Sequence, residues 1–241
     1  MTTKHSSTAP VTGTRPRLLD LFSGAGGAAM GYYRAGFDVV GVDIKPQPRY
    51  PFPFVQGDAL EYCAMHGAEF DVIHASPPCQ AYSVATARWG ADQVASHPAL
   101  IDDVRKLLEA TGLPYVIENV ETARAFMRSP ILLCGTSFGL GSGARELRRH
   151  RLFELGRFDI ILVPLCHHGQ RPQTITIVGG AGGKSRRDTK DGKPFANTAN
   201  RLEAMDTPWM IGREVVQAIP PAYTEYIGRQ LLQALNDEHQ A

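Results

Sequence analysis

The sequence predicts an α/β fold with a mainly parallel sheet, on three observations. Short apolar runs of strand length alternate with helical or loop segments through the first two thirds of the chain. A glycine-rich turn joins the first of these runs to a helical segment. The 241 residues, 43% hydrophobic and 20% charged, are also enough for one large domain with a sizeable core.

The individual elements follow from periodicity and from turn residues. Strands are expected over residues 17–22, 37–44, 54–58, 70–75, 115–120, 160–163 and 174–178. Helices are expected over residues 28–35, 97–110 and 222–235. In the second helix Pro98 suits the first helical position and Gly112 suits the position after the last turn. Residues 179–200, rich in Gly, Lys, Arg and Asp, predict a long exposed loop.

The ends of the chain and its cysteines favour a cytoplasmic protein. Residues 1–16 are rich in Thr, Ser and Pro and lack the apolar stretch of a signal peptide, so we expect a disordered leader. No apolar run is long enough to predict a membrane-spanning helix. The four cysteines are spread along the chain, which favours free thiols over a disulfide framework.

Two basic segments interrupt a mildly acidic chain. Residues 145–157 hold five arginines and two glutamates, and residues 184–193 hold five basic and two acidic residues. Each segment therefore carries a net charge of +3, although the whole chain carries only +1. This distribution suits a protein that touches phosphate on one face, and two solvated charged loops would give the same pattern.

The glycine-rich turn predicts a site for a cofactor that contains a nucleoside. Gly24, Gly26 and Ala29 fit the pattern G-x-G-x-x-G/A, which lets the backbone approach a ligand beside free N–H groups of a helix. Asp43 ends the next strand, where a carboxylate can bind ribose hydroxyls, and Asp58 ends the third strand similarly. The glycines alone would also fit a simple tight turn, so the prediction depends on the acids.

Cys79 stands in a context that is unusual for a structural cysteine. It follows Ser76-Pro77-Pro78 directly after an apolar strand. This position is at the carboxyl edge of the predicted sheet, where the active sites of open α/β folds gather. A structural cysteine lies more often inside an apolar strand. Cys79 is therefore a candidate nucleophile.

Six motifs together resemble the DNA cytosine-5 methyltransferase family in order and approximate spacing. They are FSGAGG from Phe22, Asp43, Gly57-Asp58, Ser76-Pro77-Pro78-Cys79-Gln80, Glu118-Asn119-Val120 and Arg149-His150-Arg151. The resemblance covers about residues 17–153 and returns weakly near 201–202 and 219–221. It implies a Rossmann-like, S-adenosylmethionine-dependent methyltransferase fold with a small recognition subdomain, in a small member of the bacterial or phage type that serves restriction–modification or self-protection.

The resemblance also implies the catalytic roles. Cys79 would add as a thiolate to C6 of a flipped-out cytosine, which makes C5 reactive toward the methyl group. Glu118 would hydrogen-bond or protonate N3, and Arg151 would contact O2 and help keep Cys79 ionised. Arg149 would support the site, and Asn119 would order the loop around the cysteine.

The same resemblance implies contacts to the cofactor and to double-stranded DNA. The residues expected to bind S-adenosylmethionine are Phe22, Gly24, Gly26, Gly27, Asp43, Ile44, Asp58 and Pro78. Those expected to contact DNA are Gln80, Ser83, Lys184, Arg186 and Arg187, the last three from the basic loop. The sequence does not predict an oligomeric state.

The chain departs from this family in its short recognition region. The expected parts are the leader 1–16, the catalytic domain 17–153, the recognition region 154–205 and a C-terminal segment 206–241 that completes the catalytic domain. So short a region implies loose recognition, a partner that supplies specificity, or a substrate other than ordinary duplex DNA. Methylation of tRNA cytosine, transfer of a modified one-carbon group and a catalytically silent nucleic-acid-binding relative stay open as alternatives.

Cys166-His167-His168 raises the question of a zinc site. Such a site would need a further ligand, for example Cys134 or His150, and the spacing does not match that of zinc motifs. Adjacent histidines also point in different directions on most backbones. The sequence therefore predicts no metal.

Overall fold

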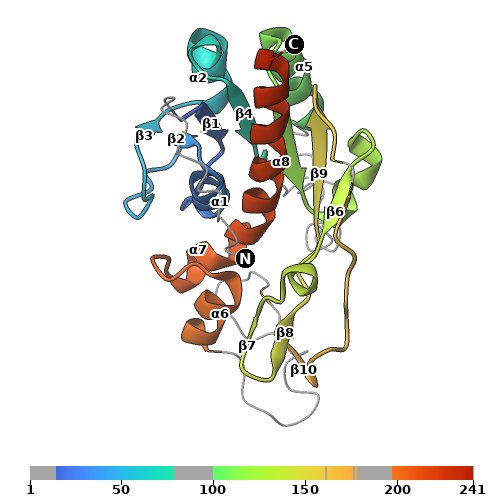
Figure 1. The fold of residues 1–241 in the computed structure, drawn as a ribbon. Helices are drawn as coiled ribbons and strands as arrows, with labels where there is room; N and C mark the ends of the chain where they lie inside the picture. Colours follow the sequence, from blue (N-terminus) through green and yellow to red (C-terminus); the bar gives the residue numbers. More distant parts are fainter. Residues whose placement is uncertain (1–14, 79–99, 161, 176, 178–196, 241) are drawn as a thin grey trace, which may run out of the picture.

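The computed structural model describes residues 15–78, 100–160, 162–175, 177 and 197–240 (Figure 1). Its main feature is a seven-stranded sheet in the order β3-β2-β1-β4-β5-β9-β6. A separate three-stranded sheet has the order β10-β8-β7. The expected α/β fold with a mainly parallel sheet is confirmed.

The strands of the main sheet are β1 (Arg17–Leu21), β2 (Asp38–Asp43), β3 (Phe54–Gln56), β4 (Val72–Ala75), β5 (Tyr115–Asn119), β6 (Ile131–Leu133) and β9 (Arg151–Gly156). Those of the second sheet are β7 (Gly141–Ser142), β8 (Arg145–Leu147) and β10 (Gln173–Ile175). The α-helices are α1 (Gly27–Ala35), α2 (Ala59–His66), α5 (Ile101–Thr111), α6 (Thr198–Met205), α7 (Gly212–Gln217) and α8 (Pro221–Gln240). The part of the chain that the structure describes also holds the short 3-10 helices η1 (Gly67–Glu69), η3 (Glu121–Phe126) and η4 (Gly135–Phe138).

The strand order creates a crevice beyond the carboxyl ends of β1 and β4. Strands β3, β2, β1, β4 and β5 pair in parallel, whereas β9 runs antiparallel between β5 and β6. Leu18 of β1 lies opposite Val39 of β2 on one side and Val72 of β4 on the other. After β1 the chain forms β2 and β3 on one side of it, and then returns to form β4 and β5 on its other side. Ligands of open α/β sheets bind where the strand order reverses in this way.

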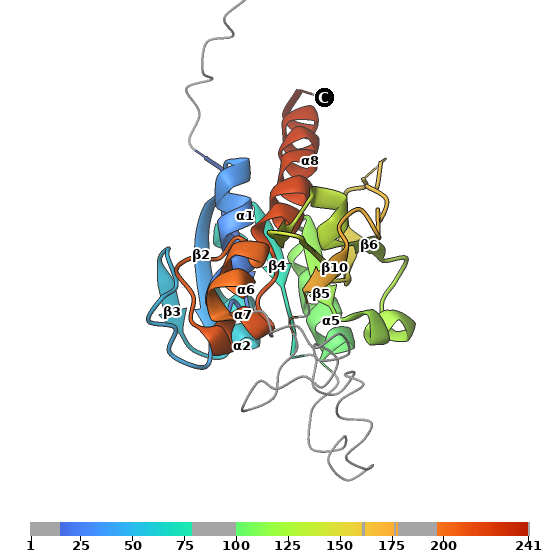
Figure 2. The ribbon, with the colours of Figure 1, turned by 90° about the horizontal axis from the view of Figure 1, so that it is seen from below.

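Helices cover both faces of this sheet, with α1 and α8 on one face and α2 and α5 on the other (Figure 2). Successive residues of a strand point to opposite faces. Leu18 therefore belongs to the core under α1 and α8, and its neighbour Leu19 belongs to the core under α2 and α5. A strand buried on both faces is apolar along most of its length, which is why these strands were recognisable in the sequence.

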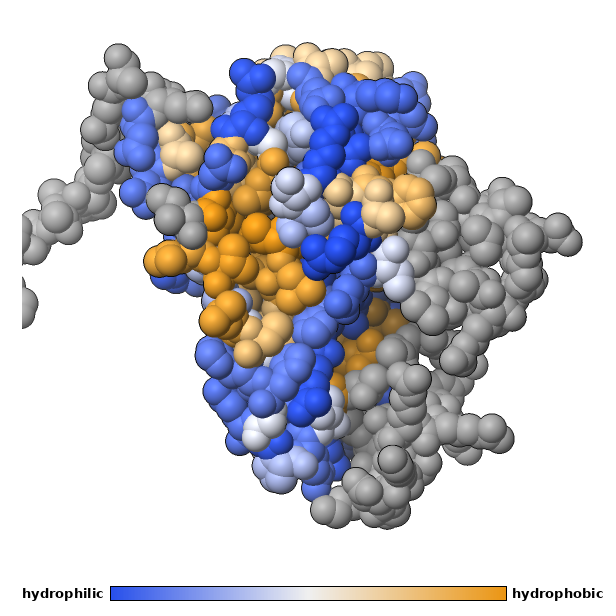
Figure 3. Space-filling view, turned by 90° about the vertical axis from the view of Figure 1, so that its right-hand side faces the viewer, coloured by the Kyte–Doolittle hydropathy of each residue, from blue (hydrophilic) through white to orange (hydrophobic). Residues whose placement is uncertain are grey.

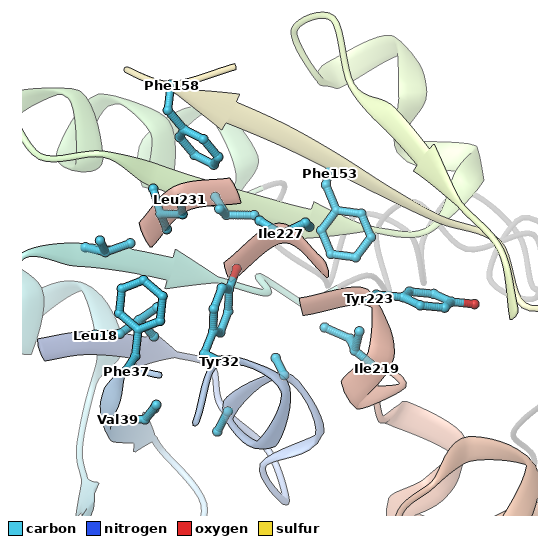
Figure 4. Close-up of a cluster of buried hydrophobic side chains, with 14 of the residues drawn as sticks. Leu18, Tyr32, Phe37, Val39, Phe153, Phe158, Ile219, Tyr223, Ile227 and Leu231 are labelled. Carbon is cyan, nitrogen blue, oxygen red and sulfur yellow. The ribbon is translucent and has the colours of Figure 1, made fainter. Parts of the chain in front are cut away.

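Helices α1 and α8 approach each other closely because small residues line their contact. A Cβ on Gly31 would lie 2.1 Å from the carbonyl oxygen of Pro221, and one on Gly228 would lie 2.7 Å from the Cβ of Ala35. Figure 4 shows the larger side chains around this contact: Tyr32, Phe37, Ile219, Tyr223, Ile227 and Leu231. The contact brings the C-terminal helix back onto the helix that follows the glycine-rich turn.

The expectations for the second half of the chain differ in part from the structure. Residues 160, 162 and 163 form no strand, and Leu162 O accepts a hydrogen bond from the Tyr226 side chain rather than from a neighbouring strand. Residues 179–196 of the expected loop lie outside the described residues, and residues 198–200 begin α6. Two strands of the second sheet, β7 and β8, precede residue 154, at which the recognition region was expected to begin. The expected domain boundaries stay a prediction.

The face that carries β6, β9 and the loop after β9 gathers apolar side chains (Figure 3). Leu162 and Leu165 of that loop are 78% and 74% exposed. Within the described ranges of the chain, no helix combines the length and the apolar character needed to cross a membrane.

A buried ion pair joins α5 to β9, and we expect it to contribute to the free energy of unfolding. Arg105 Nε donates to Glu154 Oε1 at 2.6 Å, and both side chains are at most 3% exposed. We expect Arg105→Met to lower the free energy of unfolding by about 3–5 kcal/mol, because it leaves a buried carboxylate uncompensated. Lys106→Met, which removes an exposed pair with Asp103 on the same helix, should cost about 0–1 kcal/mol. Equal losses in urea denaturation would contradict this account.

A buried carboxyl group in β1 predicts how stability depends on pH. Burial, opposed by a hydrogen bond from Tyr50, raises the pKa of Asp20 from 3.8 to about 8. Between these values the folded chain holds a proton that the unfolded chain has lost, so stability falls as pH rises from 4 to 8. We expect Asp20→Asn to flatten this slope by up to about 1.4 kcal/mol per pH unit. The exposed change Asp103→Asn is the control; a slope that Asp20→Asn leaves unchanged would refute the assignment.

Candidate active site

The carboxyl ends of β1, β2, β4 and β5 border a cavity of about 770 Å³. This volume is typical of a site for a small molecule or cofactor. The expected site residues that line it are Phe22, Gly24, Gly27, Asp43, Ile44, Asp58, Pro78, Glu118, Arg149 and Arg151. Cys79, Gln80, Ser83, Lys184, Arg186 and Arg187 lie outside the described residues. Of the expected cofactor and catalytic residues that the structure describes, all but Gly26 and Asn119 thus border one cavity.

The turn after β1 has a left-handed backbone at Phe22, Gly24 and Gly26, with φ of 57°, 50° and 83°. Gly26 does not line the cavity but needs its missing side chain, since a Cβ there would lie 2.8 Å from Pro51 Cδ. Around Gly24 a Cβ would meet nothing within 4 Å, so the backbone of this residue faces open space. A ligand can therefore approach the main chain at Gly24 closely.

Asp43 is held beside this turn by the main chain. Its Oδ2 accepts a hydrogen bond from Gly24 N at 3.0 Å, and its Oδ1 accepts one from Lys45 N at 2.9 Å. Each carboxylate oxygen has a second lone pair with which it can accept a hydroxyl. Ile44, next in the chain, is 66% exposed and offers an apolar surface at the same rim.

Asp58 has a structural role that the sequence analysis missed. Its Oδ1 caps α2 by accepting hydrogen bonds from Leu60 N at 2.9 Å and Glu61 N at 3.0 Å. The signal was present, because aspartate directly before a helix is a preferred N-cap. Capping fixes the position of this carboxylate at the rim of the cavity.

Glu118 is a buried acid at the end of β5. It is 6% exposed, and its Oε1 lies 3.0 Å from Arg151 Nε. Burial raises the pKa of Glu118; the charges of Arg151 and Arg149 and a hydrogen bond from Ser76 oppose this effect without cancelling it. A glutamate with a raised pKa can donate a proton closer to neutral pH than a surface glutamate can.

A buried hydrogen-bond chain that the sequence analysis did not identify leads to Glu118. Tyr32 Oη lies 3.0 Å from His74 Nδ1, and His74 Nε2 lies 2.9 Å from Ser76 Oγ. Burial lowers the pKa of His74 to about 3, so the imidazole is neutral and holds one donor and one acceptor nitrogen. Because Ser76 in turn bonds Glu118, the chain fixes the position of the acid. The available signal was a histidine inside an otherwise apolar strand.

Arg149 and Asn119 bind main-chain carbonyl groups. Arg149 Nη1 donates to Ile177 O at 2.9 Å, and Nη2 donates to Ala218 O at 2.8 Å. Asn119 does not line the cavity; its Nδ2 donates to Pro77 O at 3.0 Å, in the turn that leads to Cys79. The supporting roles expected for both residues and the catalytic roles of the whole set stay predictions.

The C-terminal segment closes the cavity opposite the sheet. Trp209 Nε1 donates to Ala25 O in the glycine turn at 2.9 Å. Glu214, which lines the cavity, accepts two hydrogen bonds from Arg49 Nε, at 2.8 and 3.0 Å. None of these residues was predicted, because each meets its partner across at least 165 residues of chain.

Several known proteins resemble this chain in sequence. Residues 16–130 match the model of the C-5 cytosine-specific DNA methylase family. The chain is 31% identical over 122 residues to the type II methyltransferase M.AquIA of Picosynechococcus, a match that covers 44% of this chain and 48% of the relative. It is 30% identical over 122 residues to the type II methyltransferase M.HgiGI of Herpetosiphon aurantiacus, covering 45% and 93%. The match thus spans about half the length of M.AquIA and nearly all of M.HgiGI.

The fold as a whole is also shared with a solved structure. A candidate DNA modification methyltransferase encoded within an E. coli prophage superposes with a TM-score of 0.57. The two are 18% identical in sequence, and the superposition covers 92% of this chain and 99% of the other. At this identity the likeness concerns the fold alone. From the family model and the two relatives, the chain belongs to the C-5 cytosine-specific DNA methylase family.

Proposed function

We propose that this chain transfers a methyl group from S-adenosylmethionine to C5 of cytosine in DNA, with Cys79 as the nucleophile. The observation that carries the proposal is that Glu118 and Arg151 border the same cavity as Asp43. Pro78, the residue before Cys79, also borders it. The proposed cofactor pocket and the proposed proton donor therefore border the same cavity as Pro78, which precedes Cys79 in the chain.

The residues around the glycine turn fit S-adenosylmethionine. Gly24 leaves room for the methionine portion beside the main chain, and Phe22, Gly27 and Pro78 line the same cavity. Gly26 would act by letting the turn pack against Pro51. Asp43 would accept hydrogen bonds from the ribose hydroxyls, and Ile44 would cover the adenine face. Asp58 would bind the adenine amino group through the oxygen that does not cap α2. When bound, S-adenosylmethionine supplies an electrophilic methyl group.

The chemistry on the base would be carried by Cys79 and Glu118. C5 of cytosine is a weak nucleophile, and addition of the Cys79 thiolate to C6 gives it enamine character. The raised pKa of Glu118 suits it to deliver the proton that N3 takes up in this addition. Loss of the C5 proton and expulsion of the thiolate after methylation would restore the aromatic ring.

Three further residues would hold this arrangement. Arg151, paired with Glu118, would contact O2 of the base and favour the ionised thiol. Arg149 would anchor the C-terminal segment over the site through Ala218. Asn119 would order the loop before Cys79 through Pro77.

DNA binding is proposed on the chemistry of the reaction and on charge. The reacting atoms of a cytosine lie inside the duplex, so the base has to be flipped out. Gln80 and Ser83 would contact the DNA near the flipped base. Lys184, Arg186 and Arg187 would contact phosphates, and binding should then weaken steeply with salt.

The first test is methyl transfer from labelled S-adenosylmethionine to mixed-sequence duplex DNA. We expect label on cytosine C5, and Cys79→Ala should reduce it by at least about a thousandfold, because removal of a covalent nucleophile removes the mechanism. Cys63→Ala is the matched control, since burial raises the pKa of the Cys63 thiol to about 11. Its activity should stay close to that of the wild type.

Other outcomes of the same assay would replace the proposal. Label on tRNA but not on DNA would make the chain an RNA methyltransferase. Bound cofactor without label on either nucleic acid would favour a missing partner, another one-carbon donor or a catalytically silent relative. Label on DNA that survives Cys79→Ala would contradict the nucleophile.

Asp43 provides a separate test of the cofactor site. We expect Asp43→Ala to weaken binding of S-adenosylmethionine by about ten- to a hundredfold in calorimetric titration, because it removes a charged hydrogen-bond acceptor. Asp38→Ala, at the exposed start of the same strand, should bind as the wild type does. Equal affinities of the wild type and the Asp43 variant would remove Asp43 from the site.

A further inference from the structure

Four sulfur and imidazole side chains from three separate segments meet at one point. Cys134 follows β6, His150 directly precedes β9, and Cys166 and His168 belong to the loop after β9. Their four ligand atoms all lie within 4.8 Å of one another. Cys134 is buried, His150 is half-buried and His168 is exposed, so the group begins in the core and ends at the surface.

The separations between these atoms match tetrahedral zinc. Bond lengths of about 2.3 Å to sulfur and 2.0–2.1 Å to nitrogen place two nitrogens about 3.3–3.4 Å apart and a sulfur and a nitrogen about 3.5–3.6 Å apart. His150 Nε2 and His168 Nε2 are 3.3 Å apart. Cys166 Sγ lies 3.6 Å from His150 Nε2, and Cys134 Sγ lies 3.3 Å from His168 Nε2. Three of the six edges of the tetrahedron thus agree within a few tenths of an ångström.

The surroundings of the group are those of metal ligands. His150 Nδ1 lies 3.1 Å from Glu121 Oε2, the carboxylate–histidine contact that fixes the tautomer in which Nε2 can bind a metal. Thr136 Oγ1 lies 3.2 Å from Cys134 Sγ and can donate to a thiolate.

The loop that carries Cys166 and His168 is held in place by hydrogen bonds next to each ligand. Ser137 Oγ donates to Leu165 O at 2.9 Å, immediately before Cys166. Gly169 N donates to Glu146 Oε1 at 2.9 Å, immediately after His168. The main chain around the two loop ligands is therefore set by residues on η4 and β8, which reduces the entropy lost when a metal binds.

We propose that Cys134, His150, Cys166 and His168 bind one zinc ion. Zinc binds to exactly this combination of thiolate and imidazole ligands in tetrahedral sites, and two thiolates with two neutral imidazoles balance its charge. Binding releases the two thiol protons. All four positions are filled by the protein, so the ion stabilises the fold and takes no part in chemistry.

The position of this site links it to the cavity. His150 lies between Arg149 and Arg151, and both arginines border the cavity. Zinc bound to His150 would therefore fix the start of β9 to β6 and to the loop after β9. The inference does not rest on the proposed function, because metal content is measured without substrate.

The test is the zinc content of the full chain, purified without a histidine tag and dialysed. We expect about one zinc per chain by mass spectrometry of the metal, and at least about a tenfold loss in Cys166→Ser and His168→Ala. His167→Ala is the matched control and should keep its zinc. Its neighbours in the chain are both ligands, but the residue bonds Thr136 through its backbone nitrogen and its side chain is not among the four.

Cobalt keeps the proposal testable if a variant fails to fold. Cobalt(II) added to the metal-free wild-type chain should give the visible absorption of a tetrahedral ion and a charge-transfer band from sulfur, and zinc should displace it. A folded Cys166→Ser or His168→Ala chain that keeps stoichiometric zinc would overturn the proposal. So would a wild-type chain that holds neither zinc nor tetrahedral cobalt, or one in which Cys134 and Cys166 form a disulfide.

Discussion

The parallel pairing of β4 with β1, on the side opposite β2, is the constraint on which the site depends. β1 and β4 are neighbours, but the chain continues from β1 to one half of the sheet and from β4 to the other half. The loops after these two strands therefore diverge and leave a crevice between them. The glycine turn with Asp43 lies on one side of this crevice, and Pro77, Pro78 and Glu118 lie on the other. The residues proposed to bind the cofactor and those proposed to act on the base thereby line opposite sides of one cavity.

A parallel sheet leaves that cavity open above, and the C-terminal part of the chain closes it. α8 packs on α1 through small residues, and Arg149 binds the main chain just before α8 at Ala218. Trp209 meanwhile reaches the glycine turn at Ala25. The C-terminal part of the chain therefore contacts both α1, which follows the glycine turn, and the segment of Arg149.

The parts that the sequence could predict are those set by local pattern. Strands buried on both faces have to be apolar, and the turn at Gly26 tolerates no side chain, so β1, α1 and Asp43 were recognisable. The contact of Tyr32 with His74 and that of Arg149 with Ala218 were not recognisable, because they join residues 42 and 69 positions apart in the chain. Residues 160–163 were expected to form a strand from their apolar side chains, but residues 160, 162 and 163 form none, and Leu162 O accepts a hydrogen bond from the Tyr226 side chain instead.

The difference between local pattern and distant contacts also explains the zinc site. The spacing of the cysteines and histidines in the sequence argued against a metal, whereas their positions in the fold argue for one. Zinc motifs recognised in sequence bring their ligands in pairs from one turn, whereas here Cys134 and His150 come from the ends of different strands. Among the described residues, the second sheet and helices α6 and α7 share a buried cluster of six residues. Small structural units commonly add a metal or a cross-link that stabilises them. A zinc ion at this place would tie the loop that leads to β10 of the second sheet to β6 and β9 of the main sheet.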